Sequence, residues 1–231
     1  MPKSRRSKLV TLTQTSKKTR EDREKIGEEI HECLDKYTYV WVFNVNNMRN
    51  TFLKDIRQDW KGSRILYGRT RVMQKAFGRT PEEEYKENLS QLAKLVVGDV
   101  GLLLTNEKPD VVQEYFESFV KKDYARAGLA APLTFTVPEG VVYATGGNLP
   151  VEEDVPMVHS METTLRGLGM PTILKAGKVI LGGDFTVCKE GQTLDGKQTR
   201  LLKHFGIAVS TFKVNLIASY SSETNEVTEL A

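Results

Sequence analysis

The spacing of apolar positions predicts that helices and strands alternate from about Thr19 to residue 122. A first helix is indicated by apolar residues that recur at intervals of three and four. These residues are Ile26, Ile30, Cys33, Leu34 and Tyr37. The run Tyr37–Val45 that follows is rich in β-branched and aromatic residues, so it predicts a buried strand.

Four further helices and two further strands are predicted before residue 123. Asn46 or Asn47 can cap a helix whose apolar side carries Met48, Phe52, Ile56 and Trp60. Thr80–Glu83 (TPEE) combines a threonine cap with proline at the first helical position, and it predicts the start of another helix. The remaining elements are strands at Ser63–Tyr67 and Val100–Leu104, a short helix after Arg71 and a helix from Pro109.

Glycine and proline are concentrated in residues 123–206, which hold twelve of the eighteen glycines and five of the eight prolines. Short runs of apolar residues there predict a helix around Met157–Leu168 and three strands. The strands are Leu133–Val137, Val179–Leu181 and Phe185–Cys188. Phe212–Tyr220 then has the pattern of one more buried strand.

This texture predicts an α/β domain that is interrupted by an inserted module. The first domain would comprise residues 19–122 and 207–220, and the inserted mixed α/β module would comprise residues 123–206. Such insertions are tolerated because only the two ends of the module need to meet. A basic flexible tail at 1–18 and a polar acidic tail at 221–231 would flank the domains.

Basic side chains are concentrated in two stretches, although the net charge is only +3. Residues 1–20 carry seven basic side chains and no acidic one, and residues 47–80 carry nine against Asp55 and Asp59. The rest of the chain therefore carries about −11. Segregated charge of this kind favours a surface that faces a polyanion such as nucleic acid. A basic surface that is merely solvated is the alternative.

The sequence offers little support for catalysis. His31, His159 and His204 are not within metal-ligand spacing of another His or Cys, and no nucleophile elbow or phosphate-binding Gly-Lys-Ser/Thr loop occurs. The glycine doublets at 146–147 and 182–183 are typical of tight turns, and Glu152–Asp154 of a solvated loop. We therefore predict that the protein is not an enzyme and uses no metal, cofactor or small-molecule substrate.

The cysteines and the N-terminus indicate an intracellular protein. Cys33 and Cys188 lie far apart, which favours free thiols over a disulfide or a zinc site. No run approaches the roughly 18 apolar residues of a membrane span, and the charged N-terminus is not followed by the apolar stretch of a secretory signal.

The most informative basic cluster surrounds the turn at residue 68. A strand delivers Arg64, and the next helix begins near Arg69, Thr70 and Arg71. Free N–H groups and the helix dipole favour a phosphate at such a helix start. Lys75 lies one turn after Arg71 on the same face.

The preceding strand-to-helix turn offers Asn47 and Arg49 at a second helix start. Two basic turns of one sheet would form a cradle for a folded RNA backbone, since guanidinium groups bind phosphate with two hydrogen bonds and stack on bases. Arginines that only solubilise the edge of the sheet are the alternative.

Several motifs resemble those of the mRNA turnover protein 4 family. That family is the assembly-stage paralogue of the ribosomal protein that anchors the acidic stalk on the large subunit. The motifs occur in the same order, and the resemblance covers roughly residues 1–220. They are Pro2–Lys8, Tyr39–Asn50 (YVWVFNVNNMRN), Tyr67–Met73 (YGRTRVM), Tyr124–Pro132 and Gly169–Lys178.

The resemblance implies an α+β fold, namely a ferredoxin-like α/β sandwich that binds RNA and carries an inserted domain. It implies a placeholder that binds large-subunit rRNA at the stalk base in nucleolar and nuclear precursors, with shuttling to the cytoplasm as a further expectation. Besides this pre-ribosomal particle, the expected partners are the neighbouring stalk-base ribosomal protein and a release factor. The positions carried over as RNA-facing are Asn47, Arg49, Arg64, Arg69, Thr70, Arg71 and Lys75, with Lys3, Arg5, Arg6 and Lys8 of the tail adding contacts.

Two departures from related patterns bear on this interpretation. Where the family commonly has Lys-Asn after the turn glycine, this chain has Arg69-Thr70, which keeps charge and hydrogen-bonding capacity. The chain ends shortly after Phe212–Tyr220, without long helices for recruiting stalk dimers, which favours the assembly factor over the ribosomal protein. A short stalk-base protein of mature ribosomes and, in a different class, a small α/β enzyme stay open as alternatives.

Overall fold

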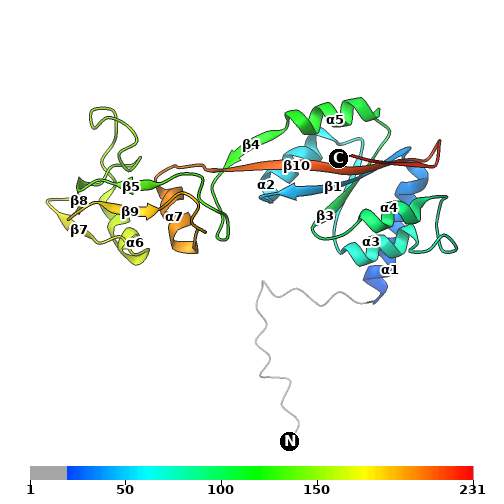
Figure 1. Ribbon diagram of the computed structural model, residues 1–231, viewed down its shortest axis with the longest axis horizontal. Coiled ribbons are helices and arrows are strands. Elements are labelled where there is room, and N and C mark those ends of the chain that lie inside the picture. Colours follow the sequence, from blue (N-terminus) through cyan, green and yellow to red (C-terminus); the bar gives the residue numbers. More distant parts are fainter. Residues whose placement is uncertain (1–19, 231) are drawn as a thin grey trace, which may run out of the picture. The chain divides into compact units, whose positions relative to one another are not determined.

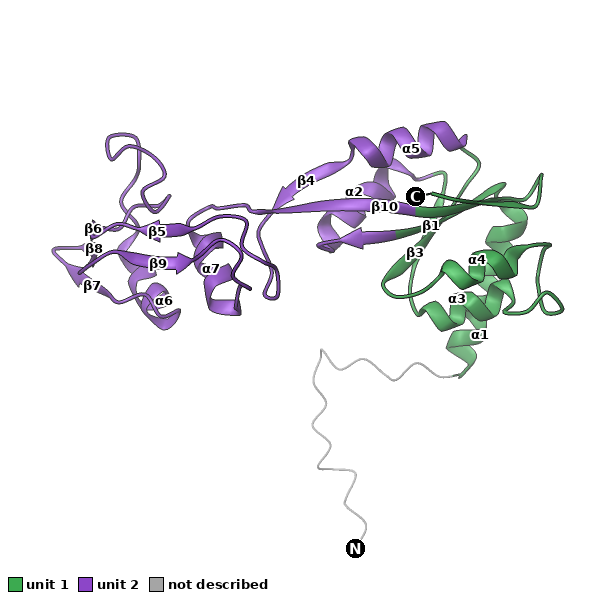
Figure 2. Ribbon diagram, viewed as in Figure 1, with its two compact units in different colours: residues 1–43, 62–107, 217–231 green, residues 44–61, 108–216 purple. Residues whose placement is uncertain are grey.

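The computed structural model describes residues 20–230, whose helices and strands are shown in Figure 1. The basic segment at 1–18, with the predicted contacts Lys3, Arg5, Arg6 and Lys8, lies outside the described residues. Contacts divide the chain into two compact units, coloured separately in Figure 2. Unit 1 comprises residues 1–43, 62–107 and 217–231, and unit 2 comprises residues 44–61 and 108–216.

Unit 1 combines strands of the main sheet with three packed helices. The sheet has the strand order β11-β10-β1-β3-β2, in which β2 and β11 run antiparallel to β3 and β10. The strands are β1 (Tyr39–Asn46), β2 (Arg64–Tyr67), β3 (Val100–Thr105), β10 (Ser210–Ser221) and β11 (Glu226–Glu229). The helices are α1 (Arg20–Lys36), α3 (Thr70–Phe77) and α4 (Leu89–Leu95). The predicted α+β architecture is therefore confirmed.

The core of unit 1 forms where the apolar faces of these helices meet the sheet. Ile30 and Leu34 of α1 and Phe77 of α3 are fully buried, and all six residues of β3 are buried. Burying one large apolar side chain contributes roughly 1.5–3 kcal/mol. The helix face and the strand predicted from apolar spacing are thus the elements that hold this unit together.

The helix start predicted at Thr80–Glu83 is wrong. These residues make a single turn, and α4 begins only at Leu89. The Glu84 carboxylate accepts hydrogen bonds from the backbone N–H groups of Asn88 and Ser90, both at 2.9 Å. It thereby satisfies donors that a helix start leaves without intrahelical partners, and this places the helix further along the chain.

The caps predicted at Asn46 and Asn47 are also wrong. α2 (Asn50–Asp59) starts after Arg49, whose side chain makes no cap hydrogen bond. Asn47 has a φ of 54°, a left-handed conformation that asparagine tolerates. Its side-chain amide donates to the Thr211 carbonyl at 2.8 Å, so Asn47 turns the chain at the end of β1 instead of capping α2.

Unit 2 contains an aromatic cluster between α2 and α5 (Pro109–Ser118). Trp60 packs edge-on against Tyr115, with ring centroids 5.3 Å apart, and stacks on Phe116 at 5.9 Å. Phe52 of α2 contacts Phe212 at the start of β10, with a centroid distance of 5.2 Å. The apolar side predicted for α2 is therefore confirmed. A strand that was not predicted, β4 (Val120–Asp123), pairs antiparallel with the start of β10.

The glycine-rich segment of unit 2 has a core of its own, in which Leu165, Met170 and Val179 are fully buried. Its strands are β5 (Phe135–Val137), β6 (Gly140–Val141), β7 (Thr172–Lys175), β8 (Lys178–Leu181) and β9 (Phe185–Cys188). β5 pairs with β9, and β8 lies between β6 and β7. Its helical elements are the 3-10 turn η2 (His159–Met161), α6 (Glu162–Gly167) and α7 (Gly196–His204). The three predicted strands and the helix near residue 162 are confirmed, whereas β6, β7 and α7 were missed.

Candidate nucleic-acid interface

The N-terminal end of α3 is open to an anionic ligand. A helix leaves the N–H groups of its first turn without intrahelical acceptors. Here the cap residue Arg69 has extended backbone and makes no side-chain cap hydrogen bond, and the first turn, which begins at Thr70, contains no acidic residue. The helix dipole also favours negative charge at this end. The local geometry therefore suits phosphate.

The orientation of α3 places its basic side chains outward. Met73 and Phe77 on one face are buried in the core of unit 1, at 2% and 0% exposure. This packing fixes the rotation of the helix, so that Arg69, Arg71 and Lys75 are exposed. Arg71 and Lys75 are four residues apart and share one face. The structure thus brings together the group that the sequence placed around this turn.

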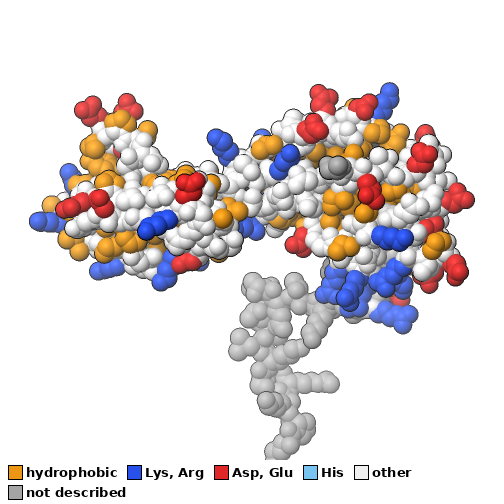
Figure 3. Space-filling view, viewed as in Figure 1, with side chains coloured by type: hydrophobic (Ala, Val, Ile, Leu, Met, Phe, Trp, Pro, Cys, Tyr) orange, Lys and Arg blue, Asp and Glu red, His pale blue; other side chains and the backbone are white. Residues whose placement is uncertain are grey.

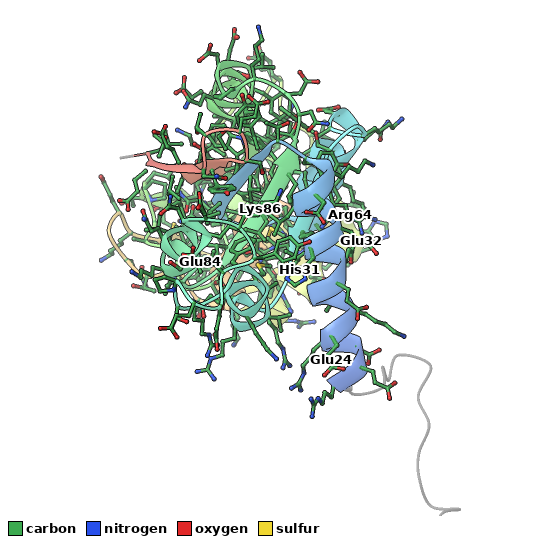
Figure 4. The ribbon with its side chains drawn as sticks, turned by 90° about the vertical axis from the view of Figure 1, so that its right-hand side faces the viewer. Glu24, His31, Glu32, Arg64, Glu84 and Lys86 are labelled. Carbon is green, nitrogen blue, oxygen red and sulfur yellow. The ribbon has the colours of Figure 1, made fainter. Side chains whose placement is uncertain are left out.

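α1 is held against α3 by a histidine and a tyrosine. The His31 Nε2–H donates to the Ala76 carbonyl oxygen at 2.8 Å, and the ring carries its proton on Nε2 because a carbonyl can only accept. The imidazole stacks on Tyr85, with centroids 4.1 Å apart and planes 4° from parallel. The Tyr85 hydroxyl in turn donates to Asp35 at 2.7 Å, which raises the pKa of the phenol. Figure 4 shows His31 on the side of α1 away from Arg64.

An open cleft of about 470 Å³ lies between α1 and α3. Its basic lining residues outnumber its carboxylates by four to two, and Figure 3 shows Lys and Arg gathered at this end of unit 1. The charged lining residues are Arg20, Arg23, Glu24 and Glu28 of α1 and Arg71 and Lys75 of α3. Sequence reasoning counted Arg20 with the tail and missed Arg23, because only the packing of α1 on α3 places it beside this group.

Arg64 is separated from the cleft. Its guanidinium pairs with the carboxylate of Glu29, and both side chains are substantially exposed, at 53% and 36%. Glu29 and His31 are two residues apart, so they point to nearly opposite sides of α1. Arg64 therefore lies at the far side of α1, with part of its charge offset by its partner.

Asn47 and Arg49 belong to unit 2, so the structure does not join them to the α3 group. The Arg49 Nε donates to the Asp123 carboxylate, and its Nη2 donates to the Tyr124 carbonyl at 3.2 Å. Asn47 is bonded to Thr211, as described above. Both side chains therefore have structural partners that the sequence did not reveal.

The described residues offer little that would support catalysis. Within residues 20–230 no three His, Cys, Asp or Glu side chains are placed to hold a metal ion. Gly146 and Gly147 have φ values of 68° and 91°, as expected of a turn. The prediction of a solvated Glu152–Asp154 run is wrong for Asp154, which is 7% exposed and accepts hydrogen bonds from the backbone and hydroxyl of Thr145. In the same range of residues, no helix has the length and apolarity to cross a membrane.

Comparison with known sequence families adds a relationship to this geometry. The family described as "Ribosomal protein L10" matches residues 18–121. A second family, described as an insertion domain in the 60S form of this ribosomal protein, matches residues 125–207.

Individual relatives cover nearly the whole chain. The chain is 56% identical over 223 residues to "Ribosome assembly factor mrt4" of Schizosaccharomyces pombe, covering 96% of this chain and 92% of that protein. It is 52% identical to "Ribosome assembly factor MRT4" of Saccharomyces cerevisiae, over 98% and 97% of the two chains. A more distant relative, "Large ribosomal subunit protein uL10" of Thermococcus onnurineus, is 26% identical over 84% of this chain and 54% of that protein.

Proposed function

We propose, on the premise that the chain belongs to the mRNA turnover protein 4 (Mrt4) family of ribosome assembly factors, which is related to ribosomal protein L10, that it binds large-subunit rRNA through the basic end of α3. Neither assembly factors nor ribosomal proteins of this kind are enzymes. The observation that carries the proposal is the open helix start with exposed Arg69, Arg71 and Lys75 and no carboxylate in its first turn. Such a surface binds a phosphate backbone by charge and by N–H donation.

The proposal includes a placeholder role at the stalk base of nucleolar and nuclear precursors. The relationship to ribosomal protein L10 over residues 18–121 supports this role, because two proteins with the same RNA-binding domain compete for one site. The factor would lie beside the neighbouring stalk-base ribosomal protein. It would leave when a release factor acts, and the stalk-anchoring ribosomal protein would replace it.

Sedimentation tests the stage of assembly. The tagged protein is expected to sediment with nuclear large-subunit precursors and to be depleted from translating ribosomes. Fluorescence of the same tagged protein should concentrate in the nucleolus and nucleus. Stable association with translating ribosomes would contradict the placeholder role and support a short stalk-base protein instead.

Salt-dependent RNA binding tests the site. Each phosphate contact contributes about 0.7–0.9 to the slope of log affinity against log salt, so replacing both Arg69 and Arg71 by alanine should lower the slope by about 1.4–1.8. Lys36→Ala is the control, because it removes one exposed charge at the opposite end of α1. The probe is an in vitro transcript of the stalk-base rRNA.

The variants also separate an RNA contact from a structural role. Arg69 and Arg71 are exposed, so the double variant should unfold at the same temperature as the wild type. An unchanged affinity and slope for the double variant, at matched salt, would remove α3 from the binding site. Equal losses in the double variant and in Lys36→Ala would mean that only overall charge matters.

A further inference from the structure

We propose that the cleft between α1 and α3 receives one unpaired nucleotide of the bound RNA. The inference rests on the proposed function and deepens it, since it names the kind of RNA element that this end of unit 1 would recognise. Sequence-specific RNA recognition mostly targets bases that are turned out of a helix and can be enclosed by side chains. A backbone-only contact surface would need no such recess.

The shape of the cleft fits a small aromatic ligand. Its volume of about 470 Å³ falls within the roughly 300–1,000 Å³ of ligand clefts. The space exists because Gly27 and Ala76, which line it, carry little or no side chain. A Cβ atom at Gly27 would meet nothing within 4 Å. Glycine is unfavourable in the middle of a helix, so its place in α1 is explained by an occupant of the cleft better than by the fold.

The charges of the cleft indicate how a nucleotide would lie in it. Among the described residues, Arg23, Arg71 and Lys75 have no ion-pair partner, whereas Arg20 is paired with Glu24 at 2.8 Å. A phosphate would therefore be held at the rim by the three unpaired cations. The Glu28 carboxylate, also in the lining, repels phosphate but accepts hydrogen bonds from the amino or ring N–H groups of a base.

The position of the cleft favours an RNA nucleotide over a free metabolite. Arg71 and Lys75 line the cleft and also belong to the exposed basic group of α3. An RNA strand whose backbone runs past the start of α3 would therefore have one phosphate at the rim and the attached base at the opening. The apolar part of the lining, which includes Val72 and Ala76, would cover the face of that base.

Filling the cleft without changing any charge tests the inference. Gly27→Leu places a side chain in the open space, and Gly27→Ala fills less of it. The matched control is Gly62→Leu, because a Cβ atom at Gly62 also meets nothing within 4 Å and Gly62 does not line the cleft. Affinity of the full-length variants for the stalk-base rRNA transcript would be measured over a range of salt concentrations.

We expect Gly27→Leu to weaken binding by about tenfold, which is what contacts to one enclosed base contribute. The salt slope should stay unchanged, Gly27→Ala should have a smaller effect, and Gly62→Leu should bind as the wild type does. Chemical probing should show one nucleotide whose base is protected in the wild-type complex and reactive in the complex with Gly27→Leu.

The outcomes distinguish the inference from the function on which it rests. Wild-type affinity of Gly27→Leu, together with weakened binding of the Arg69→Ala, Arg71→Ala variant, would leave the function standing and overturn the cleft as a base site. Absence of binding by the wild-type chain would overturn both. Should Gly27→Leu not fold, probing of the wild-type complex decides alone, and the lack of any protected unpaired nucleotide would overturn the inference.

Discussion

Removing the Arg49 side chain should destabilise unit 2 directly, without any involvement of RNA. The guanidinium pairs with Asp123 and donates to the Tyr124 carbonyl. The Asp123 side chain is only 13% exposed, and that of Arg49 is 31% exposed. Arg49→Ala therefore leaves a largely buried carboxylate without its partner. Because hydrogen bonds to charged groups contribute about 1.5–3 kcal/mol, we expect the free energy of unfolding to fall by about 2 kcal/mol.

The pair between Arg64 and Glu29 provides the contrast within the same chain. Both of these side chains are more exposed, at 53% and 36%, so water screens the pair. Exposed ion pairs contribute about 0–1 kcal/mol. Arg64→Ala should therefore change stability little.

A double-mutant cycle measures the difference. Arg49→Ala, Asp123→Ala and the double variant would be unfolded in urea, with tryptophan fluorescence as the signal. The coupling between the two positions should be about 1–2 kcal/mol. A coupling below about 0.5 kcal/mol would refute the structural role of Arg49. Should Arg49→Ala keep full stability and yet lose RNA affinity, the original assignment of Arg49 as an RNA contact would be the better one.

Three further perturbations follow from the same structure and can be read by urea unfolding. Gly27→Ala should stabilise the protein by up to about 1 kcal/mol through helix propensity. Gly78→Ala should cost about 2 kcal/mol or more, because φ is 94° and the new Cβ would lie 2.4 Å from a backbone carbonyl oxygen; equal effects of the two substitutions would contradict this. His31→Phe keeps the ring but leaves the Ala76 carbonyl in the last turn of α3 without a donor, and a loss of about 1–2 kcal/mol is expected, so unchanged stability would show that water replaces the donor. Burial acts to raise the pKa of Glu84, but hydrogen bonds from the start of α4 outweigh it and lower the pKa below 4.5; this contribution is present above that pH and is lost as the pH falls through the lowered pKa. Glu84→Gln should accordingly lose stability less steeply in acid than the wild type, and parallel curves would refute the assignment.

The elements that could be predicted from sequence are those whose pattern is local. Ile30 and Leu34 mark the buried face of α1, and the apolar run Val100–Leu104 lies within β3. In these segments periodicity and burial agree. β11 was missed because its sequence, EVTE, is polar and short, and it becomes a strand by pairing with β10.

The misplaced helix start shows how distant contacts override local rules. Thr80–Glu83 satisfies the capping rules, yet the segment after it is fastened to α1. The Tyr85 hydroxyl donates to Asp35, and the Lys86 ammonium donates to the Leu34 carbonyl at 2.6 Å. These contacts join residues about fifty positions apart, which no local sequence window contains.

The candidate site divides in the same way. Arg71 and Lys75 could be assigned to one exposed face because their spacing alone fixes it. Arg23 could not be found, since its relation to α3 depends on how two helices pack. Arg49 was assigned to RNA because its partner Asp123 lies far along the chain.

β10 ties the completion of both units to one late event in synthesis. Residues 210–216 belong to unit 2 and pair with β4 through Ser210–Lys213, whereas Ala218–Ser221 pair with β11 in unit 1. On the ribosome, β1 and β4 are made long before this strand and must wait for it with unpaired edges. A nascent chain is therefore expected to gain its RNA-binding form only after Ser221 has emerged, so that prematurely terminated chains would not enter assembling subunits.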